Sequence, residues 1–397
     1  MKIGVSYVVS STAAAEIANS NNFPWLEVLS KLTGHEFEVC PADRLSEYDL
    51  ALNFIGGGGT EGIFKANIDK LPRPVFLLTT GANNSLAASM EILSYLRINK
   101  IPGEIIHGTD EFVANRINQL ACITRCRKKL DGMRIGRVGK PSDWLISSDV
   151  DAAASKSLNN IEIIDISMEE FFAEIGKNEY VENAYTAMIK AKGYDEKEVE
   201  KSLYIYGALK RIADRYGLGG LTVRCFDLLD TVKATSCVAL AILNAEGIYA
   251  SCEGDVPALL SMAVIGELSG KPVFMANPSR IDTSNNEIIF AHCTLPVTMV
   301  EDFELMTHFE SQLGVALRGK LKEGPVTVFK TSGLLDEHFV SRADLLENLG
   351  EYNLCRTQIR LKMEENVDYF LKRSIGNHHL IVQGDCRDLV EEFYRWR

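Results

Sequence analysis

Acidic and amide side chains lie where two predicted strands of this chain end. Glu253 and Asp255 stand between a strand-like run at 247–252 and an apolar helical stretch at 256–268, and Asn277 follows the next strand-like run. Open α/β sheets bind their ligands at the carboxyl ends of the strands. Carboxylate and amide oxygens are the ligands that hard divalent cations prefer. The segment therefore predicts a site for a divalent cation or a polyol.

Each acidic residue also has a structural alternative. Glu253 could be metal ligand and general base together, or an acidic group that the helix dipole stabilises. Asp255 could approach the same ion, but Asp before Val-Pro also starts a helix well, so it is equally an N-cap candidate for 256–268.

Four further polar residues carry open alternatives. His292 follows a strand and could line a pocket or be a hydrogen-bonded core residue. Arg280 could bind a substrate oxygen or a charged sugar group, or form a surface ion pair. His378 and His379 are adjacent, and side chains of neighbouring strand residues point to opposite faces. At most one of the two histidines is therefore expected to face the site.

The elements that must position these residues fall into three predicted regions. Strands and helices alternate through residues 1–130 and again through 131–270, which predicts two tandem Rossmann-like domains with parallel sheets. Residues 271–397 instead predict a β-rich C-terminal domain, a barrel or sandwich, closed by a terminal helix at 385–397. The expected strands are 2–9, 36–40, 48–55, 74–79, 133–138, 161–166, 221–226, 247–252, 272–276, 288–291, 326–330, 337–343, 357–361 and 379–382.

Composition excludes several function classes. The 397 residues carry a net charge of −12, which disfavours binding to nucleic acid or to an anionic membrane. No apolar run approaches the length of a membrane span. The first ten residues are interpreted as a buried strand, not as a signal peptide. Nine cysteines without a CxxC pair indicate reduced thiols, and hence a cytoplasmic protein.

Four short motifs occur in an order and spacing that resemble a known family. They are Cys-Glu-Gly-Asp-Val at 252–256, the segment 270–277, Ala-His-Cys-Thr-Leu-Pro at 291–296 and Gly-Asn-His-His at 376–379. Together they resemble the L-fucose isomerase and L-arabinose isomerase superfamily, with the best match to its shorter, fucose isomerase-like members. The glycine-rich segment 57–61 and the helix start at 84–88 also look similar to its first domain.

The resemblance implies a metal-dependent aldose–ketose isomerase that acts on an open-chain sugar through an enediol. In that family a Glu, an Asp and a His bind a divalent ion, usually Mn²⁺, with Mg²⁺ or Co²⁺ as alternatives. By position these ligands correspond to Glu253, Asn277 and His378. Glu253 and Asp255 are the implied catalytic residues, and Asn277 is also an implied substrate contact, as are Arg280 and His292.

Asn277 departs from the family pattern, because the family has Asp there. An amide oxygen can still bind a hard cation, but it cannot act as a general acid or base. Asp255 or Asp282 would then supply the second proton-transfer group. The alternative is a catalytically altered or non-catalytic carbohydrate-binding or regulatory homologue.

The resemblance further implies a homo-oligomer, a trimer or hexamer, with a sugar as its small-molecule partner. We expect the glycine-rich loop at 56–60 to be a contact between subunits or with substrate, because bare backbone permits close approach.

Overall fold

The computed structural model describes residues 1–9 and 24–396, and the chain divides into two compact units. The first is Met1–Arg125 with Glu392–Arg397, and the second is Cys126–Glu391. The sequence-based boundary at residue 130 lies close to this division. The boundary at 270 falls inside the second unit and stays a prediction.

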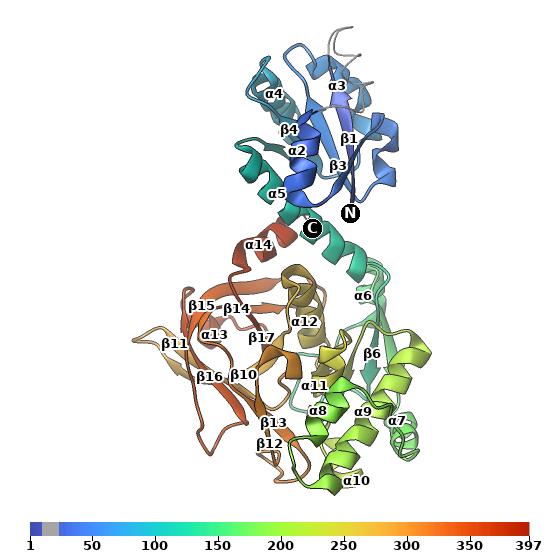
Figure 1. Ribbon diagram of the computed structural model, residues 1–397, viewed down its shortest axis with the longest axis vertical. Coiled ribbons are helices and arrows are strands. Elements are labelled where there is room, and N and C mark those ends of the chain that lie inside the picture. Colours follow the sequence, from blue (N-terminus) through green and yellow to red (C-terminus); the bar gives the residue numbers. More distant parts are fainter. Residues whose placement is uncertain (10–23, 397) are drawn as a thin grey trace. The chain divides into compact units, whose positions relative to one another are not determined.

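The first unit is built around a five-stranded parallel sheet in the order β2-β1-β3-β4-β5 (Figure 1). Its three central strands, β1, β3 and β4, are mainly buried, as is usual for parallel sheets with covered faces, whereas the edge strand β2 is partly exposed. The strands are β1 (Lys2–Val8), β2 (Glu36–Val39), β3 (Leu50–Ile55), β4 (Val75–Thr79) and β5 (Gly103–Ile106). The helices are α2 (Pro24–Thr33), α3 (Glu61–Asn67), α4 (Ser85–Ile98) and α5 (Asp110–Leu130), which continues into the second unit.

The glycine-rich loop after β3 packs against its own chain. Gly58 N–H donates to the carbonyl oxygen of Asn83 at 2.9 Å, and a Cβ on Gly57 would come within 2.9 Å of the same oxygen. Close approach of backbone thus explains glycine at this loop within one chain. The expected contact with another subunit stays a prediction.

The second unit begins with a four-stranded parallel sheet in the order β7-β6-β8-β9. Its strands are β6 (Arg134–Val138), β7 (Glu162–Ile166), β8 (Gly220–Val223) and β9 (Tyr249–Cys252). The helices are α6 (Ala152–Asn159), α7 (Met168–Ile175), α8 (Ala184–Lys190), α9 (Glu196–Tyr216), α10 (Asp227–Thr231), α11 (Cys237–Ala245) and α12 (Val256–Ser269). The predicted parallel α/β character is confirmed for both sheets.

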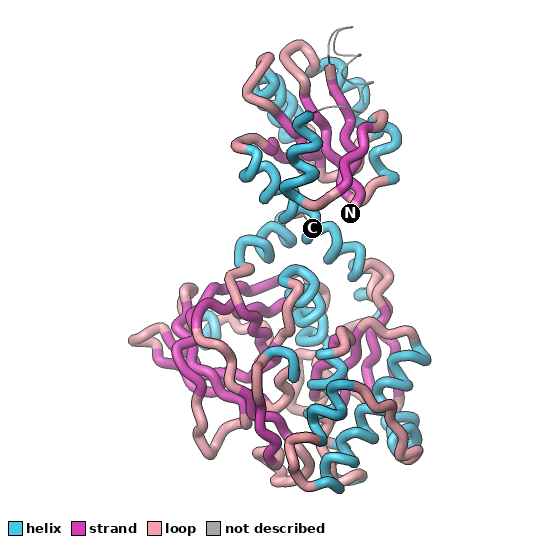
Figure 2. The backbone as a smooth tube through the Cα atoms, viewed as in Figure 1, coloured by secondary structure: helices cyan, strands magenta, loops and turns pink. Residues whose placement is uncertain are grey.

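The same unit ends in a closed antiparallel barrel in the order β10-β11-β16-β15-β14-β17, with a separate β12-β13 pair. The barrel strands are β10 (Phe274–Asp282), β11 (Glu287–His292), β14 (Gly324–Thr331), β15 (His338–Asn348), β16 (Thr357–Met363) and β17 (His379–Gln383). The remaining elements are β12 (Phe303–Met306), β13 (Ala316–Gly319), α13 (Asp368–Lys372) and α14 (Arg387–Arg395). Loops and turns join most of these strands (Figure 2). The β-rich C-terminal region is confirmed as a barrel.

One predicted strand belongs to the barrel and not to a parallel sheet. The run at 272–276 was expected to end a parallel strand at Asn277, but β10 continues through Asn277 to Asp282 and belongs to the barrel. Asn277 pairs with Ala291 of β11 in the antiparallel ladder. It therefore lies within a strand, and the argument from strand ends does not apply to it.

Helix α12 joins the sheet to the barrel. It contacts β9 of the sheet and β14 and β17 of the barrel, and Figure 1 shows it beside β14 and β17. Its residues are buried all round, which is typical of a helix inside a core. Asp255 caps its N-terminus and Gly270, at φ 65°, ends it.

Among the described residues, we find no helix that is long and apolar enough to cross a membrane.

Candidate active site

The candidate site lies at the carboxyl edge of the second sheet. Strand β7 lies on one side of β6, and β8 lies on the other. The direction in which successive strands are added to the sheet therefore reverses between β6 and β8. This is the edge where α/β sheets bind ligands. Trp144, from the loop after β6, donates from Nε1 to Glu253 Oε2 at 2.7 Å. Its ring also packs edge-on against Phe226, which follows β8, at 4.8 Å between centroids.

A strained turn presents Glu253. Glu253 and Gly254 both have left-handed backbone conformations, with φ of 64° and 74°. Such a conformation is unfavourable for a residue with a side chain and persists where the surrounding structure holds it. Gly254 N–H donates to Val223 at 3.1 Å, and the Glu253 carbonyl accepts from the Ser142 N–H at 2.8 Å. These bonds hold the turn between two neighbouring loops.

Asp255 is fully engaged. Its Oδ1 accepts from the Ala258 N–H at 2.8 Å, so the expected N-cap role is confirmed. Lys330 of β14, 1% exposed like Asp255, places Nζ 3.8 Å from the same oxygen. The other oxygen lies 2.8 Å from His378 Nδ1. Asp255 therefore has no free edge for a substrate, and its geometry is that of a positioning residue.

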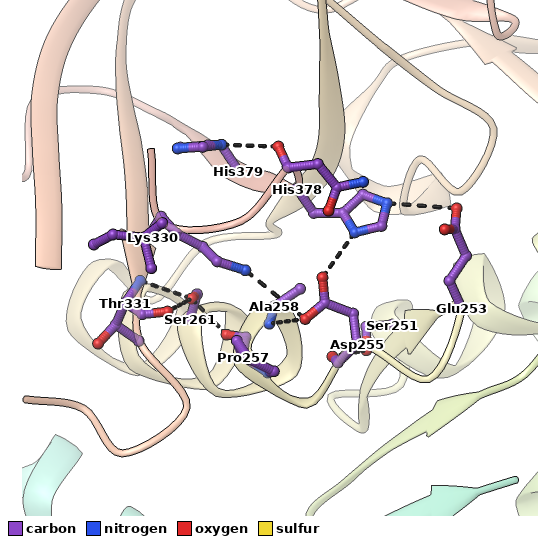
Figure 3. A network of polar contacts seen from close by, with 12 residues as sticks. Ser251, Glu253, Asp255, Pro257, Ala258, Ser261, Lys330, Thr331, His378 and His379 are labelled. Atoms are coloured by element: carbon purple, nitrogen blue, oxygen red, sulfur yellow. Dashed lines mark hydrogen bonds and ion pairs between the residues drawn. The ribbon is translucent and has the colours of Figure 1, made fainter. Parts of the chain in front are cut away.

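His378 lies between the two carboxylates, as Figure 3 shows. Its ring is fully buried, with Nδ1 on Asp255 and Nε2 3.5 Å from Glu253 Oε1. Among the described residues, Nε2 has no hydrogen-bond partner of acceptable geometry. A buried polar atom without a partner is costly, and it marks a place where an ion or substrate atom fits. His379 points elsewhere, with Nε2 3.1 Å from the hydroxyl of Tyr369.

The charges of this group are coupled. Burial raises the pKa of Glu253, but the contacts with His378 outweigh it and lower that pKa to about 2. For Asp255, burial is likewise outweighed by Lys330 and His378, so its pKa falls below the usual value. Burial disfavours a charged His378, yet the two carboxylates raise its pKa to about 9. Without a metal, the site thus holds a protonated imidazole between two carboxylates.

A second cluster shares Glu253. Cys252 Sγ lies 3.6 Å from His292 Nε2, and ligand atoms of Cys252, Glu253 and His292 all lie within 4.8 Å of one another. His292 Nδ1 is 2.9 Å from Thr294 Oγ1, and burial lowers the pKa of His292 to about 3. The imidazole of His292 is therefore neutral at physiological pH. Its ring centre is 5.5 Å from that of His378.

The remaining predicted residues form no hydrogen bond with this group among the described residues. Asn277 Oδ1 accepts a hydrogen bond from Asn377 Nδ2 at 3.1 Å, and Asn377 directly precedes His378 in the chain. Arg280 forms a two-pronged ion pair with Glu351, and its side chain is 56% exposed, which matches the surface alternative. Asp282 accepts backbone N–H bonds in the exposed β10–β11 turn. The structure brings together Glu253, Asp255, His292 and His378.

Sequence reasoning missed four residues of this site: Trp144, Cys252, Thr294 and Lys330. Cys252 and Thr294 lay inside motifs that the resemblance used, so their position was a usable signal. Trp144 and Lys330 are 109 and 75 residues from the partners they contact, Glu253 and Asp255. No local pattern points to either.

Fold and site together define a class: parallel α/β sheets followed by an antiparallel barrel, with buried carboxylates and histidines where sheet and barrel meet. No protein-family model matches the chain. Sulfoquinovose isomerases of Priestia aryabhattai and Priestia megaterium (strain ATCC 12872 / QMB1551) are each 25% identical over 332 residues, 79% of this chain and 74% of theirs.

A sulfoquinovose isomerase of Clostridium sp. (strain MSTE9) is 32% identical over 111 residues, which cover 28% of this chain and 25% of that protein. The chain is thus homologous to sugar isomerases over most of its length, and this supports an isomerase enzyme. The activity agrees in kind with the one that the family resemblance implies.

Proposed function

We propose that this protein is a divalent-metal-dependent aldose–ketose isomerase that acts on an open-chain sugar through an enediol. We further propose a sulfonated aldohexose of the sulfoquinovose type as its substrate. The similarity to sulfoquinovose isomerases supports the reaction and the substrate. The buried Glu253–His378–Asp255 arrangement is the single structural observation that carries the proposal.

The residues fit a divalent metal. The buried Nε2 of His378 lacks a partner among the described residues and faces a carboxylate oxygen of Glu253 at 3.5 Å. Metal-binding histidines usually place their other ring nitrogen on a carboxylate, as His378 does with Asp255. Glu253 and His378 would therefore hold the ion. The part of Asn277 in this site rests on the family resemblance.

A bound divalent ion supplies Lewis-acid polarisation of the sugar carbonyl, which makes the neighbouring C–H more acidic. Glu253 is the proposed base that takes the proton from C2 and returns it to C1. The hydroxyl proton moves from O2 to O1, so the reaction needs no oxidant. Trp144 holds the Glu253 carboxylate in one orientation through its 2.7 Å hydrogen bond.

Asp255 has a different duty in this scheme. It aligns His378 and is itself fixed by the helix N-terminus and Lys330. Since both of its oxygens are occupied, we do not assign it a proton transfer with substrate.

The test is isomerisation by the purified full chain after reconstitution with Mn²⁺, Co²⁺, Zn²⁺ or Mg²⁺. Sulfoquinovose, L-fucose, L-arabinose and D-glucose are incubated in D₂O, and ketose formation and deuterium at C1 of the ketose and C2 of the recovered aldose are followed by NMR. We expect ketose from sulfoquinovose, with deuterium at C1 of the ketose and, through the reverse reaction, at C2 of the remaining sulfoquinovose. Absence of ketose and of exchange from every sugar with every metal would refute the proposal. Sugar binding without turnover would instead favour a carbohydrate-binding role.

The variant Glu253→Gln is the matched control. Gln keeps the shape and can still accept the Trp144 hydrogen bond, but it cannot take a proton. We expect the full-length variant to fold and to lose turnover by about 10²–10⁴-fold. Turnover near that of the parent would assign the proton transfer to another residue.

A further inference from the structure

We propose that Cys252 and His292 are ligands of the divalent ion together with Glu253 and His378, and that this mixed set selects Zn²⁺ or Co²⁺ over Mn²⁺. This inference rests on the metal dependence in the proposed function, and it names the ligands and the class of metal.

Interatomic distances support one shared ion. Protein ligands bind zinc at about 2.0–2.3 Å, so neighbouring ligands lie about 3.3–3.8 Å apart near the tetrahedral angle, and a catalytic zinc can take a fifth ligand such as a sugar oxygen. Cys252 Sγ and His292 Nε2 are 3.6 Å apart, and His378 Nε2 and Glu253 Oε1 are 3.5 Å apart. Each pair therefore has the spacing of two ligands on one ion.

Three of the four residues form one cluster, and His378 adjoins it through Glu253. Ligand atoms of Cys252, Glu253 and His292 fall within 4.8 Å of one another, and all three residues are buried. Two imidazoles bound through Nε2 to one ion have ring centres about 5 Å apart. The rings of His292 and His378 are 5.5 Å apart.

Both histidines are oriented as metal ligands are. Nδ1 of His378 is held by Asp255 at 2.8 Å, and Nδ1 of His292 is held by Thr294 Oγ1 at 2.9 Å. This arrangement leaves Nε2 of each ring for the ion. Outer partners of this kind fix the tautomer and the ring orientation of metal-binding histidines.

The chemistry of the donor atoms sets the metal class. Thiolate and imidazole favour zinc and other borderline or soft ions, whereas Mn²⁺ and Mg²⁺ favour carboxylate, carbonyl and water oxygens. Two nitrogens, one sulfur and one carboxylate thus disfavour Mn²⁺. On binding, the Cys252 S–H bond breaks, a sulfur–metal bond forms and the thiol proton leaves to solvent.

Cobalt spectroscopy tests the thiolate directly. Metal-free full-length protein is titrated with Co²⁺, and the near-ultraviolet sulfur-to-cobalt charge-transfer band is recorded. We expect the band in the parent and in Cys237→Ser, a matched control because Cys237 is buried but outside the cluster. Cys252→Ser should lose the band. A parent without the band, or Cys252→Ser with it, would overturn the inference.

Zinc affinity provides a second measurement, with competition between equimolar Zn²⁺ and Mn²⁺ read by elemental analysis. We expect zinc to be retained, and Cys252→Ser and His292→Gln to bind it at least about tenfold more weakly. Thr294→Val, which keeps every ligand, should weaken binding by about 10–100-fold. If Cys252→Ser fails to fold, the zinc affinities of His292→Gln and Thr294→Val test the inference. Unchanged zinc affinity in all folded variants would contradict the assignment.

These readouts separate the inference from the proposed function. An isomerase that works with Mn²⁺ and binds metal equally well after Cys252→Ser would retain the function and refute the ligand set. A protein that binds zinc through Cys252 but converts no sugar would retain the ligand set and refute the function.

Discussion

At the scale of single residues, Asp255 has two structural roles that one substitution can separate. It caps α12 through Oδ1 and supplies negative charge to buried Lys330 and His378. Asparagine is as good an N-cap as aspartate. Asp255→Asn therefore keeps the cap, removes the charge and replaces the oxygen that faces His378 Nδ1 with an amide NH₂ group.

We expect Asp255→Asn to lower the free energy of unfolding by about 3–5 kcal/mol, because it leaves Lys330 buried beside a neutral group. Adding Lys330→Met should recover much of this loss, since an apolar side chain of similar size needs no counter-charge. Denaturant unfolding at one pH measures both variants. Asp282→Asn, in an exposed turn, is the control and should stay within about 0.5 kcal/mol of the parent. A double variant no more stable than the single one would show that Lys330 is not the source of the loss.

Asn277 distinguishes two ligand sets that share Glu253 and His378. Its side chain bonds to Asn377, and no hydrogen bond with Glu253 or His378 is found among the described residues. If Cys252 and His292 complete the set, Asn277→Asp should leave zinc affinity unchanged. If Asn277 is itself a ligand, the new carboxylate should tighten Mn²⁺ binding, because a charged oxygen holds a hard cation more strongly. Calorimetric titration of both ions into both proteins separates these cases, and we expect the first.

Part of the site could be predicted from residues alone. Glu253 was identified because it follows a buried strand, and His378 because its motif resembled a family. Both converge in the structure. Lys330 and Trp144 could not be found this way, because only tertiary folding brings them to Asp255 and Glu253. A lysine in a strand and a tryptophan in a loop carry no spacing signal.

At the scale of elements, the turn from β9 to α12 controls the position of Glu253. A Cβ on Gly254 would lie 2.6 Å from the Lys140 carbonyl oxygen and 2.7 Å from Pro141 Cα. Gly270 ends the same helix with a similar φ of 65°, but a Cβ there meets nothing within 4 Å. The two glycines thus share a left-handed backbone conformation and differ in the space available to a side chain.

We expect Gly270→Ala to cost about 1–2 kcal/mol, the penalty of a left-handed conformation for a residue with a side chain. Gly254→Ala should cost more, and it should also weaken metal binding because the loop that contacts Glu253 must move. Thermal unfolding and zinc titration of both variants provide the comparison. Equal effects in the two proteins would mean that the close approach of Lys140 and Pro141 does not position the site.

The elements also show where sequence patterns reach their limit. Buried parallel strands such as β1, β4 and β6 were predicted nearly to the residue, because a continuous apolar run is typical of them. The start of β10 has the same apolar pattern, yet it pairs antiparallel in the barrel. Its partner, β17, lies about 100 residues away in sequence. Strand pairing at that distance is decided by tertiary packing.

At the scale of the whole molecule, the end of the chain belongs to its first unit. Residues Glu392–Arg397 pack with Met1–Arg125, whereas the sequence placed the terminal helix with the β-rich region. Glu392 pairs with Arg116 of α5. The amphipathic pattern of a terminal helix predicts that its apolar face is buried, but it does not identify the surface against which the helix packs.

Trp396 lets this division be tested in solution. Its side chain is 9% exposed, and its ring packs edge-on against Phe76 of β4 at 5.6 Å between centroids. Removing a buried aromatic ring costs about 3–5 kcal/mol. We expect Trp396→Ala to increase hydrogen exchange in peptides from residues 24–125 and to leave peptides from 133–391 unchanged. Zinc affinity should also stay at the parent value, because every proposed ligand lies in the second unit.

Ile98→Ala, at a side chain that is 81% exposed, is the control within the first unit and should change neither region. Increased exchange around Glu253 and His378 in Trp396→Ala would mean that the two units unfold together and that the site depends on the first.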